Sequence, residues 1–263
     1  MNNTIEKENG IISVCGLKKA YGKHDVLKGV DFSVAKGQIF SLLGSNGAGK
    51  TTVVKILSTL LEFNAGAISI CGYDLIKEPN KIRDCISLTG QYAAVDEMLT
   101  GRENMHLVAR FRHLKDYKSK VTELLEMFEL DKAADRLVKK YSGGMRRKVD
   151  LAMSLLGDPQ IIFLDEPTTG LDPQSRLSLW KTIKDLKNKG TTIFLTTQYL
   201  EEAERLSDIV AVLDNGVIVS SGTPQELKMA LKNIDGQEYE KDMPTLEDVF
   251  LSIINKKGEG KNE

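Results

Sequence analysis

Short apolar runs alternate along the chain with stretches in which apolar residues recur at helical spacing. The runs at 39–43 and 161–164 are almost wholly apolar and do not alternate with polar residues, which is the pattern of strands buried on both faces. The apolar residues that follow the first run, from Val53 to Leu61, fall on helical positions. This succession of buried strand and helix predicts an α/β fold with a mainly parallel sheet.

Antiparallel strands are predicted at both ends of this core. Residues 11–18 and 30–34 have strand patterns and precede the first buried run, so we expect an antiparallel β layer attached to the parallel sheet. The runs at 209–213 and 217–221 flank Asp214-Asn215-Gly216, a strong hairpin signal. Further strands are predicted at 67–71, 86–88 and 191–196.

The middle of the chain differs from the rest in its glycine content and in the spacing of its apolar residues. Glycine becomes scarce after Gly101, and apolar residues recur there at helical spacing. We interpret these stripes as core-facing and expect a helical insert over about 92–157. The two stripes consist of Met105, Val108, Ala109 and Phe111, and of Val121, Leu124, Leu125 and Phe128.

The remaining pattern divides the chain into a domain over 11–236 and a C-terminal extension over 237–263. Thr245 and Asp248 have the spacing of a capping box, and apolar residues at 246, 249, 250, 253 and 254 predict an amphipathic helix. This helix either packs on its own domain or contacts a partner. The residues from Lys256 onward are charged and predict a disordered tail.

Composition restricts the class of protein. Hydrophobic residues make up 41% and charged residues 28%, as in soluble globular proteins, and the net charge of −1 gives no reason to bind nucleic acid. Cys15, Cys71 and Cys85 form no C-x-x-C pair and lie among apolar residues, so we expect reduced thiols that are buried or half-buried. No membrane-spanning run or signal peptide is present, which predicts a cytoplasmic protein that needs a partner to act at a membrane.

A glycine-rich loop that fits G-x-x-x-x-G-K-[ST] joins the strand at 39–43 to its helix. Its glycines let the backbone N–H groups face a phosphate at the positive end of the helix. Lys50 adds a positive charge and the Thr51 hydroxyl can ligate Mg²⁺, so the loop predicts a nucleoside triphosphate site rather than a turn with a chance lysine. We call this the phosphate loop; it consists of Gly44, Ser45, Asn46, Gly47, Ala48, Gly49, Lys50, Thr51 and Thr52.

Two acids end the buried strand at 161–164. Asp165 is placed to hold Mg²⁺ opposite Thr51, and Glu166 can polarise a water for attack on the γ-phosphate. A helix N-cap pair is the alternative, which the phosphate loop upstream disfavours. Ser142-Gly143-Gly144 opens a helix that ends near Leu156, with Ser142 as a plausible N-cap and N–H groups free for an anion.

The order of these motifs resembles that of ABC-type ATPases, over nearly the whole chain from about Val14 to Leu227. The segment 142–145, which we call the signature segment, is the most specific of these motifs, because it separates this class from other phosphate-loop proteins. The resemblance implies a RecA-like P-loop NTPase core and a head-to-tail dimer, in which ATP lies between one phosphate loop and the partner's Ser142, Gly143, Gly144 and Met145. The other matching motifs are Gln91, Tyr141, Asp165-Glu166-Pro167 and Gly170-Leu171-Asp172.

The resemblance also implies roles for single residues. Tyr21 matches the aromatic residue that stacks on adenine, although an ordinary half-buried tyrosine fits the sequence too. Gln91 matches the glutamine that reaches Mg²⁺ or the attacking water and senses the membrane subunit. Asp172 matches the loop that communicates across the dimer.

Four positions depart from the family pattern. Ser45 replaces a common proline and Thr51 a common serine, while Met145 replaces the usual glutamine; the first two changes keep the motif and the hydroxyl. Gln198 stands where most members have a histidine that contacts the γ-phosphate. Since glutamine donates hydrogen bonds but does not titrate near neutral pH, Gln198 would act by positioning.

These departures resemble the daunorubicin-resistance-type branch of ABC exporters, carried by the segments 89–96, 141–147, 197–203 and 244–251. That branch pairs a separate ATPase with an ABC-2-type membrane permease. The resemblance therefore implies an ATP-dependent homodimer at the cytoplasmic face of the membrane that drives export of a drug, antibiotic, lipid or polymer. The alternatives are a soluble ABC ATPase of DNA repair or translation, and a regulatory ATP-binding module with little turnover.

Overall fold

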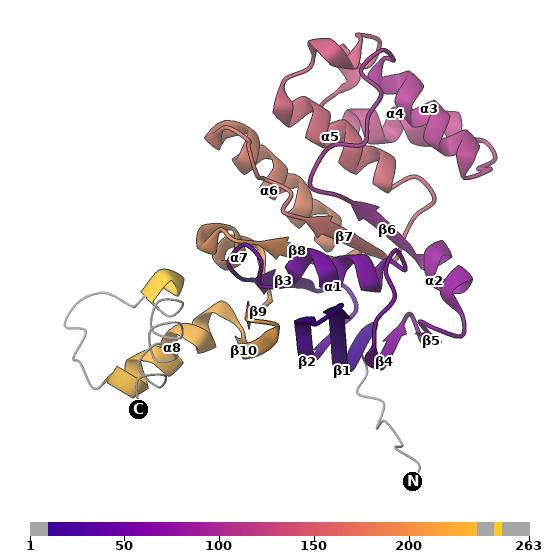
Figure 1. Ribbon diagram of the computed structural model, residues 1–263. Helices are drawn as coiled ribbons and strands as arrows, with labels where there is room; N and C mark the ends of the chain where they lie inside the picture. The colour runs from indigo at the N-terminus through magenta and orange to yellow at the C-terminus, as the bar shows by residue number, and fades with distance from the viewer. Residues whose placement is uncertain (1–9, 236–244, 249–263) are drawn as a thin grey trace.

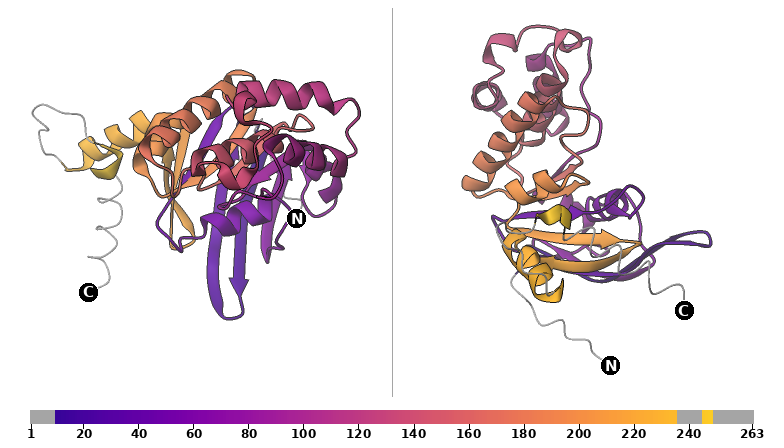
Figure 2. Two further views of the ribbon diagram at one scale, coloured as in Figure 1. Left: turned by 90° about the horizontal axis from the view of Figure 1, so that it is seen from above. Right: turned by 90° about the vertical axis from the view of Figure 1, so that its left-hand side faces the viewer.

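The computed structural model describes residues 10–235 and 245–248, which form two β-sheets with helices around them. Figure 1 shows the sheets in the lower part of the molecule and the helices α3, α4 and α5 above them. The right-hand view in Figure 2 shows the same separation. The expected α/β fold with an antiparallel layer and a helical insert is therefore confirmed.

The larger sheet has six strands in the order β10-β9-β3-β8-β7-β6. All neighbouring pairs are parallel except β10 and β9, which form the predicted hairpin. Because the carboxyl ends of β3, β7 and β8 lie side by side, the residues that follow these strands meet at one edge of the sheet. The strands are β3 Ile39–Leu43, β6 Ile86–Thr89, β7 Ile161–Asp165, β8 Thr192–Thr197, β9 Ile209–Asp214 and β10 Val217–Gly222.

The smaller sheet is antiparallel in the order β2-β1-β4-β5. Its strands are β1 Ile12–Tyr21, β2 His24–Val34, β4 Ala65–Ile70 and β5 Tyr73–Asp74. Phe32 of β2 contacts Phe40 of β3 and Phe194 of β8, with ring centroids 5.1 and 5.6 Å apart. This aromatic contact joins the two sheets, and α1 (Lys50–Leu57) packs in the same core.

The opposite face of the larger sheet is covered by α5 (Gly143–Ser154) and α6 (Pro173–Asn188), whose apolar residues share a core with β3, β7 and β8. That core continues into α3 (Gly101–Phe111) and α4 (Tyr117–Met127), so the insert and the sheet are one packed unit. The remaining elements are α2 Pro79–Cys85, α7 Leu200–Leu206, α8 Pro224–Asp235 and the single 3-10 turns Asp131–Ala133 and Val138–Lys140.

Two burial expectations were wrong. Phe111 is 75% exposed, although Met105 and Ala109 are buried. Six residues on a helix turn the side chain by about 600°, which places Phe111 roughly a third of a turn from Met105. Cys15 is exposed because it alternates with the buried Val14 along β1, whereas Cys71 and Cys85 are half-buried and all three thiols are free.

The capping box at Thr245 is confirmed. The Thr245 N–H donates to Asp248 Oδ2 at 2.8 Å, and the Asp248 N–H donates to Thr245 Oγ1 at 3.2 Å. Leu246 is 2% exposed and packs in a small core with Leu43 and Val212, so the start of this helix lies on its own domain. The apolar positions 249, 250, 253 and 254 lie outside the described residues, and the domain bounds at 236 and 237 stay a prediction. None of the described helices is long and apolar enough to cross a membrane.

Candidate functional site

The phosphate loop leaves the end of β3 and wraps around the first turn of α1, which begins at Lys50. Gly49 has φ = 111°, and no side chain caps the helix there, so the first N–H groups of α1 are available to a ligand. A Cβ atom at Gly44 would lie 2.4 Å from the Leu213 carbonyl oxygen. Glycine is therefore required at position 44 by close packing and at position 49 by backbone conformation.

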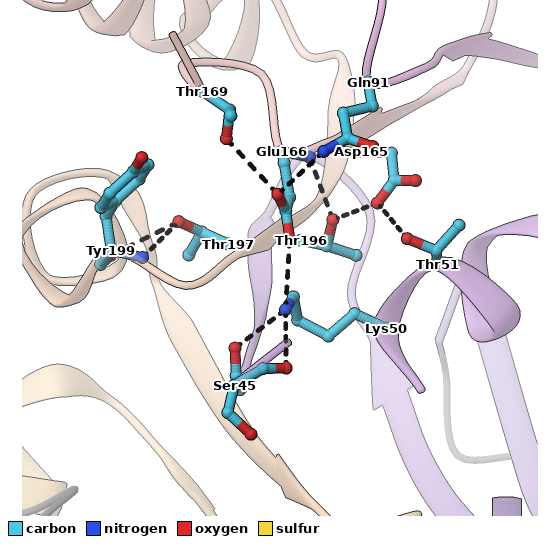
Figure 3. A network of polar contacts seen from close by, with 11 residues as sticks. Ser45, Lys50, Thr51, Gln91, Asp165, Glu166, Thr169, Thr196, Thr197 and Tyr199 are labelled. Carbon is cyan, nitrogen blue, oxygen red and sulfur yellow. Dashed lines mark hydrogen bonds and ion pairs between the residues drawn. The ribbon is translucent and has the colours of Figure 1, made fainter. Parts of the chain in front are cut away.

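Lys50 is the charged centre of the loop and is only 4% exposed. Its Nζ donates to the carbonyl oxygens of Gly44 at 2.8 Å and Ser45 at 3.0 Å, and lies 3.2 Å from Glu166 Oε1 (Figure 3). The ammonium group thus has three oxygen partners within the chain. Charge-assisted bonds of this kind keep a buried lysine in place without apolar packing.

Asp165 ends β7 and is 6% exposed. Its Oδ1 accepts hydrogen bonds from Thr51 Oγ1 at 3.2 Å and Thr196 Oγ1 at 2.6 Å (Figure 3). The Thr51 hydroxyl and the Asp165 carboxylate are hard oxygen donors of the kind that Mg²⁺ prefers, so this part of the site fits a magnesium ion.

Glu166 has a left-handed backbone, with φ = 47°, and is 8% exposed. Its N–H donates to the Thr196 carbonyl oxygen at 3.1 Å, which holds this turn against β8. Its Oε2 lies 3.4 Å from Thr169 Oγ1 and 3.5 Å from Gln91 Nε2 (Figure 3). A left-handed non-glycine residue stores strain, which is common where a side chain has to be aimed at a ligand.

A cleft of about 400 Å³ opens above these groups. It brings the phosphate loop together with Gln91, Glu166 and Gln198, which follow β6, β7 and β8. The predicted juxtaposition of these side chains is therefore present in the structure, while their chemical roles stay a prediction. The lining residues are Val26, Asn46, Gly47, Gly49, Lys50, Thr51, Thr52, Gln91, Glu166, Thr169 and Gln198.

The signature segment does not line this cleft. Ser142 and Gly143 are exposed at the start of α5, where Ser142 Oγ accepts a hydrogen bond from the Met145 N–H at 3.2 Å as the predicted N-cap. Gly144 is buried, and a Cβ atom there would lie 2.7 Å from Ser175 Cβ of α6. The exposed start of the segment, Ser142 and Gly143, is therefore open to solvent outside the cleft.

Tyr21 and Asp172 also lie outside the cleft lining. Tyr21 ends β1 and is 50% exposed, and Lys19 Nζ lies 5.1 Å from the centroid of its ring. Asp172 is the N-cap of α6, and its carboxylate accepts from the Ser175 N–H at 3.0 Å and the Ser175 hydroxyl at 2.5 Å. These bonds to Ser175 hold the pKa of Asp172 below its usual value.

The sequence analysis missed several polar residues around the site. Thr196 bonds to Asp165, and its place could have been found because the two residues are direct partners in the parallel register of β7 and β8. Thr169 contacts Glu166 from the loop that follows. Arg147 was missed because it follows another arginine, a pattern typical of a solvated helix face, yet it is 5% exposed.

Comparison with known proteins agrees with this geometry. The family model described as ABC transporter matches residues 27–169. A daunorubicin resistance ATP-binding protein of Streptomyces coeruleorubidus is 48% identical over 219 residues, which cover 82% of this chain and 69% of the relative. A Nod factor export ATP-binding protein of Ralstonia nicotianae is 39% identical over 249 residues, covering 94% of this chain and 78% of that protein. The chain thus spans about two thirds or more of each relative.

Solved structures show the same architecture. The ATP-binding subunit of an ABC transporter superposes with a TM-score of 0.79 at 30% identity, covering 92% of this chain and 99% of that one. A dimeric ATP-binding cassette in a post-hydrolysis state with ADP and Pi gives a TM-score of 0.72 at 25% identity, covering 81% and 98%. The expected P-loop NTPase fold and the resemblance to the daunorubicin-resistance-type branch are confirmed. The chain belongs to the ABC transporter family and is an ATP-hydrolysing, ATP-binding subunit.

Proposed function

We propose that this ATPase is the motor subunit of an exporter, which works as an ATP-dependent homodimer with a separate ABC-2-type membrane permease at the cytoplasmic face. The observation that carries the proposal is the convergence of Lys50, Glu166, Gln91 and Gln198 on one cleft, while the signature segment lies outside the cleft lining with Ser142 and Gly143 exposed. Relatives named for drug resistance and for Nod factor export support an export role.

ATP binds through the phosphate loop. The phosphates accept hydrogen bonds from the uncapped N–H groups of α1, and Lys50 turns from the carbonyl oxygens of Gly44 and Ser45 to the outer phosphates. The half-exposed ring of Tyr21 stacks on the adenine. Thr51, Asp165 and Gln91 would hold Mg²⁺, and the ion would neutralise phosphate charge when bound.

Glu166 is the general base for the attacking water. In the structure its carboxylate lies 3.2 Å from Lys50 Nζ. When Lys50 pairs with a phosphate instead, the Glu166 carboxylate is left free to accept a hydrogen bond from the attacking water. Gln91 and Thr169 contact the other carboxylate oxygen and orient it, and Gln198 donates to the γ-phosphate.

The second half of each site comes from another copy of the chain. Ser142 and Gly143 are exposed at the start of α5, so the N–H groups of the signature segment, Ser142, Gly143, Gly144 and Met145, can bind the partner's γ-phosphate there. Asp172 lies next to this surface, because its bonding partner Ser175 packs on Gly144. We assign Asp172 to communication between the two nucleotide sites.

The placement of Glu166 favours turnover over a regulatory module that only binds ATP, since a carboxylate beside Lys50 in the cleft has no evident use in binding an anion. The net charge of −1 also gives no electrostatic footprint for nucleic acid, which argues against a role on DNA or RNA.

Replacement of Glu166 by Gln tests the proposed base. Steady-state ATP hydrolysis should fall by at least about 100-fold, while ATP binding persists and an ATP-bound dimer accumulates in size-exclusion chromatography. Glu126→Gln, an exposed change on α4, serves as the control and should leave turnover unchanged. Unchanged turnover in Glu166→Gln would refute the base assignment.

The partnership with a permease has a separate test. A multi-span protein encoded beside this chain should co-purify with it and raise its ATPase rate in lipid vesicles. If no such protein is encoded beside this chain, or if it does not change the ATPase rate, the alternative of a soluble ABC ATPase is favoured instead.

A further inference from the structure

One buried arginine of α5 connects the signature helix to two loops of the site. Arg147 is 5% exposed and lies two residues after the signature segment. Its Nε donates to the Pro167 carbonyl oxygen at 2.9 Å, and its Nη1 donates to the Gly90 carbonyl oxygen at 2.5 Å. A single guanidinium group thus joins three segments that are far apart in the sequence.

The two carbonyl groups belong to the neighbours of proposed active-site residues. Gly90 immediately precedes Gln91, and Pro167 immediately follows Glu166. The side chains of Gln91 and Glu166 in turn contact each other, with Nε2 and Oε2 3.5 Å apart. The two loops that carry these side chains are therefore joined twice. One link is the contact between Gln91 and Glu166, and the other is Arg147, which bonds to the backbone of both loops.

Asp150, one turn further along α5, orients the arginine. Its Oδ2 lies 3.3 Å from Arg147 Nη1, and its Oδ1 accepts the Ala94 N–H at 3.1 Å. The loop that contains Gln91 is thus held at Gly90 by the arginine and at Ala94 by the carboxylate. Both side chains of the pair are 6% exposed, and burial lowers the pKa of Arg147 and raises the pKa of Asp150 to about 6.

A purely structural role explains this arrangement less well. Buried ion pairs are often no more stabilising than apolar side chains of the same volume, so packing alone does not call for one. Among the described residues, Arg147 Nη2 is buried without a hydrogen-bond partner, which is a further cost. The bonds that Arg147 does make across segments both end beside Gln91 or Glu166.

We propose that Arg147, oriented by Asp150, is a positioning residue for ATP hydrolysis. It holds the Gln91 and Glu166 loops at a fixed separation and ties both to the helix that carries the signature segment. A movement of α5 on contact with the partner's ATP then reaches Glu166 through the Pro167 carbonyl. The proposal rests on the proposed functions of Glu166 and the signature segment, and it adds a residue that touches neither ATP nor water.

The test compares Arg147→Lys with the wild type in the full-length chain. Lysine keeps the charge but has one ammonium group in place of the planar guanidinium. It therefore cannot donate to the Pro167 and Gly90 carbonyls with the geometry of arginine. We expect kcat for ATP to fall by about tenfold or more, with KM and the affinity for ATP changed by less than about threefold, because the phosphate contacts remain. Arg147→Met should lower kcat further if it folds, as judged by circular dichroism.

Arg102→Met is the matched control, since Arg102 also bridges two segments of the helical insert, to Asp135 at 2.8 Å, but lies outside the cleft. Its kcat should equal that of the wild type. A second arm repeats Arg147→Lys in the Glu166→Gln background under single-turnover conditions. There it should add less than about a twofold loss, because the Glu166 carboxylate, whose separation from Gln91 it fixes, is gone.

Three outcomes separate the hypotheses. An unchanged kcat in Arg147→Lys overturns the proposal, and so does an equal loss with and without Glu166, which would indicate general destabilisation. If Glu166→Gln alone leaves turnover unchanged, the proposed base fails instead, and the fall of kcat in Arg147→Lys is then assigned to Gln91.

Discussion

The loop at Glu166 and Pro167 contacts two buried ion pairs, one through the Glu166 side chain and one through the Pro167 carbonyl. The two pairs differ in what surrounds them. Lys50 and Glu166 form the first pair, 3.2 Å apart, and both line a cleft of about 400 Å³. Arg147 and Asp150 form the second, 3.3 Å apart, and bond to the backbone of Gly90, Ala94 and Pro167. The first pair faces a space that a ligand can fill, and the second is enclosed by the chain.

This difference in surroundings explains why one buried ion pair can bind a ligand while the other holds the backbone in place. Around Lys50 the oxygen partners are replaceable, because phosphate oxygens can take the place of the Gly44 and Ser45 carbonyls and of Glu166. Around Arg147 the partners are fixed parts of the fold, so removal of one leaves the others buried and unpaired. We expect changes to the first pair to affect ATP handling and changes to the second to affect geometry and stability.

The largest effect is expected at Lys50. Lys50→Ala removes the charge that pairs with the outer phosphates and should lower ATP hydrolysis by at least about 1,000-fold and abolish ATP-driven dimerisation. Hydrolysis assays and size-exclusion chromatography with ATP measure both. Lys55→Ala, an exposed change on the same helix, is the control. A Lys50→Ala variant that still dimerised and turned over would contradict the composite-site scheme.

The enclosed pair predicts a pH dependence of stability. Burial raises the pKa of Asp150 to about 6, so between pH 4 and 6 the folded state binds a proton that the unfolded state has lost. The wild type should therefore lose stability relative to Asp150→Asn as the pH rises through this window, by up to about 3 kcal/mol, with no further change above it. Urea unfolding at several pH values measures the difference.

Asp135→Asn controls for the sign of that dependence. The Arg102 guanidinium holds the pKa of Asp135 below its usual value, so the wild type should gain stability over this variant as the pH rises. If the stability difference from the wild type changed with pH in the same direction for Asp150→Asn and Asp135→Asn, burial of the Arg147 pair would not explain its behaviour.

A smaller effect is expected at Gln198 in the open cleft. Gln198→Ala removes one donor to a phosphate oxygen and should lower kcat by about tenfold. Gln198→His should restore activity and add a pH dependence near about 6.5 that the wild type lacks from this position. An Ala variant with the wild-type rate would remove Gln198 from the mechanism.

The smallest effect is expected at an exposed pair. Arg102 and Asp135 lie 2.8 Å apart with side chains 32% and 74% exposed. Solvent screens such pairs, so Arg102→Met should shift the melting temperature by less than about 2 °C in a thermal unfolding experiment. A larger shift would show that enclosure is not what gives the Arg147 pair its importance.

Much of the fold and the centre of the site followed from short-range patterns. The apolar runs predicted β3 and β7, and the Asp214-Asn215-Gly216 turn predicted the β9–β10 hairpin. The strand-loop-helix order around Lys50 and the acids after β7 predicted a shared site, because parallel strands end at one edge.

The errors and omissions came from information that sequence patterns do not hold. The burial of Arg147 depends on α5, β6 and the Pro167 loop meeting in space, and the exposure of Phe111 depends on which side of α3 the insert leaves free. Thr196 becomes part of the site only through its register opposite Asp165. Each of these facts belongs to tertiary packing, which propensity and periodicity cannot supply.

The left-handed backbone of Glu166 has a consequence for how the protein can evolve. At φ = 47° glycine would be the relaxed choice, so the carboxylate is retained against the conformational preference of its own residue. Selection for stability alone would therefore favour loss of the acid at this position. In a chain that no longer needs the carboxylate, Glu166→Gly would relieve this backbone strain.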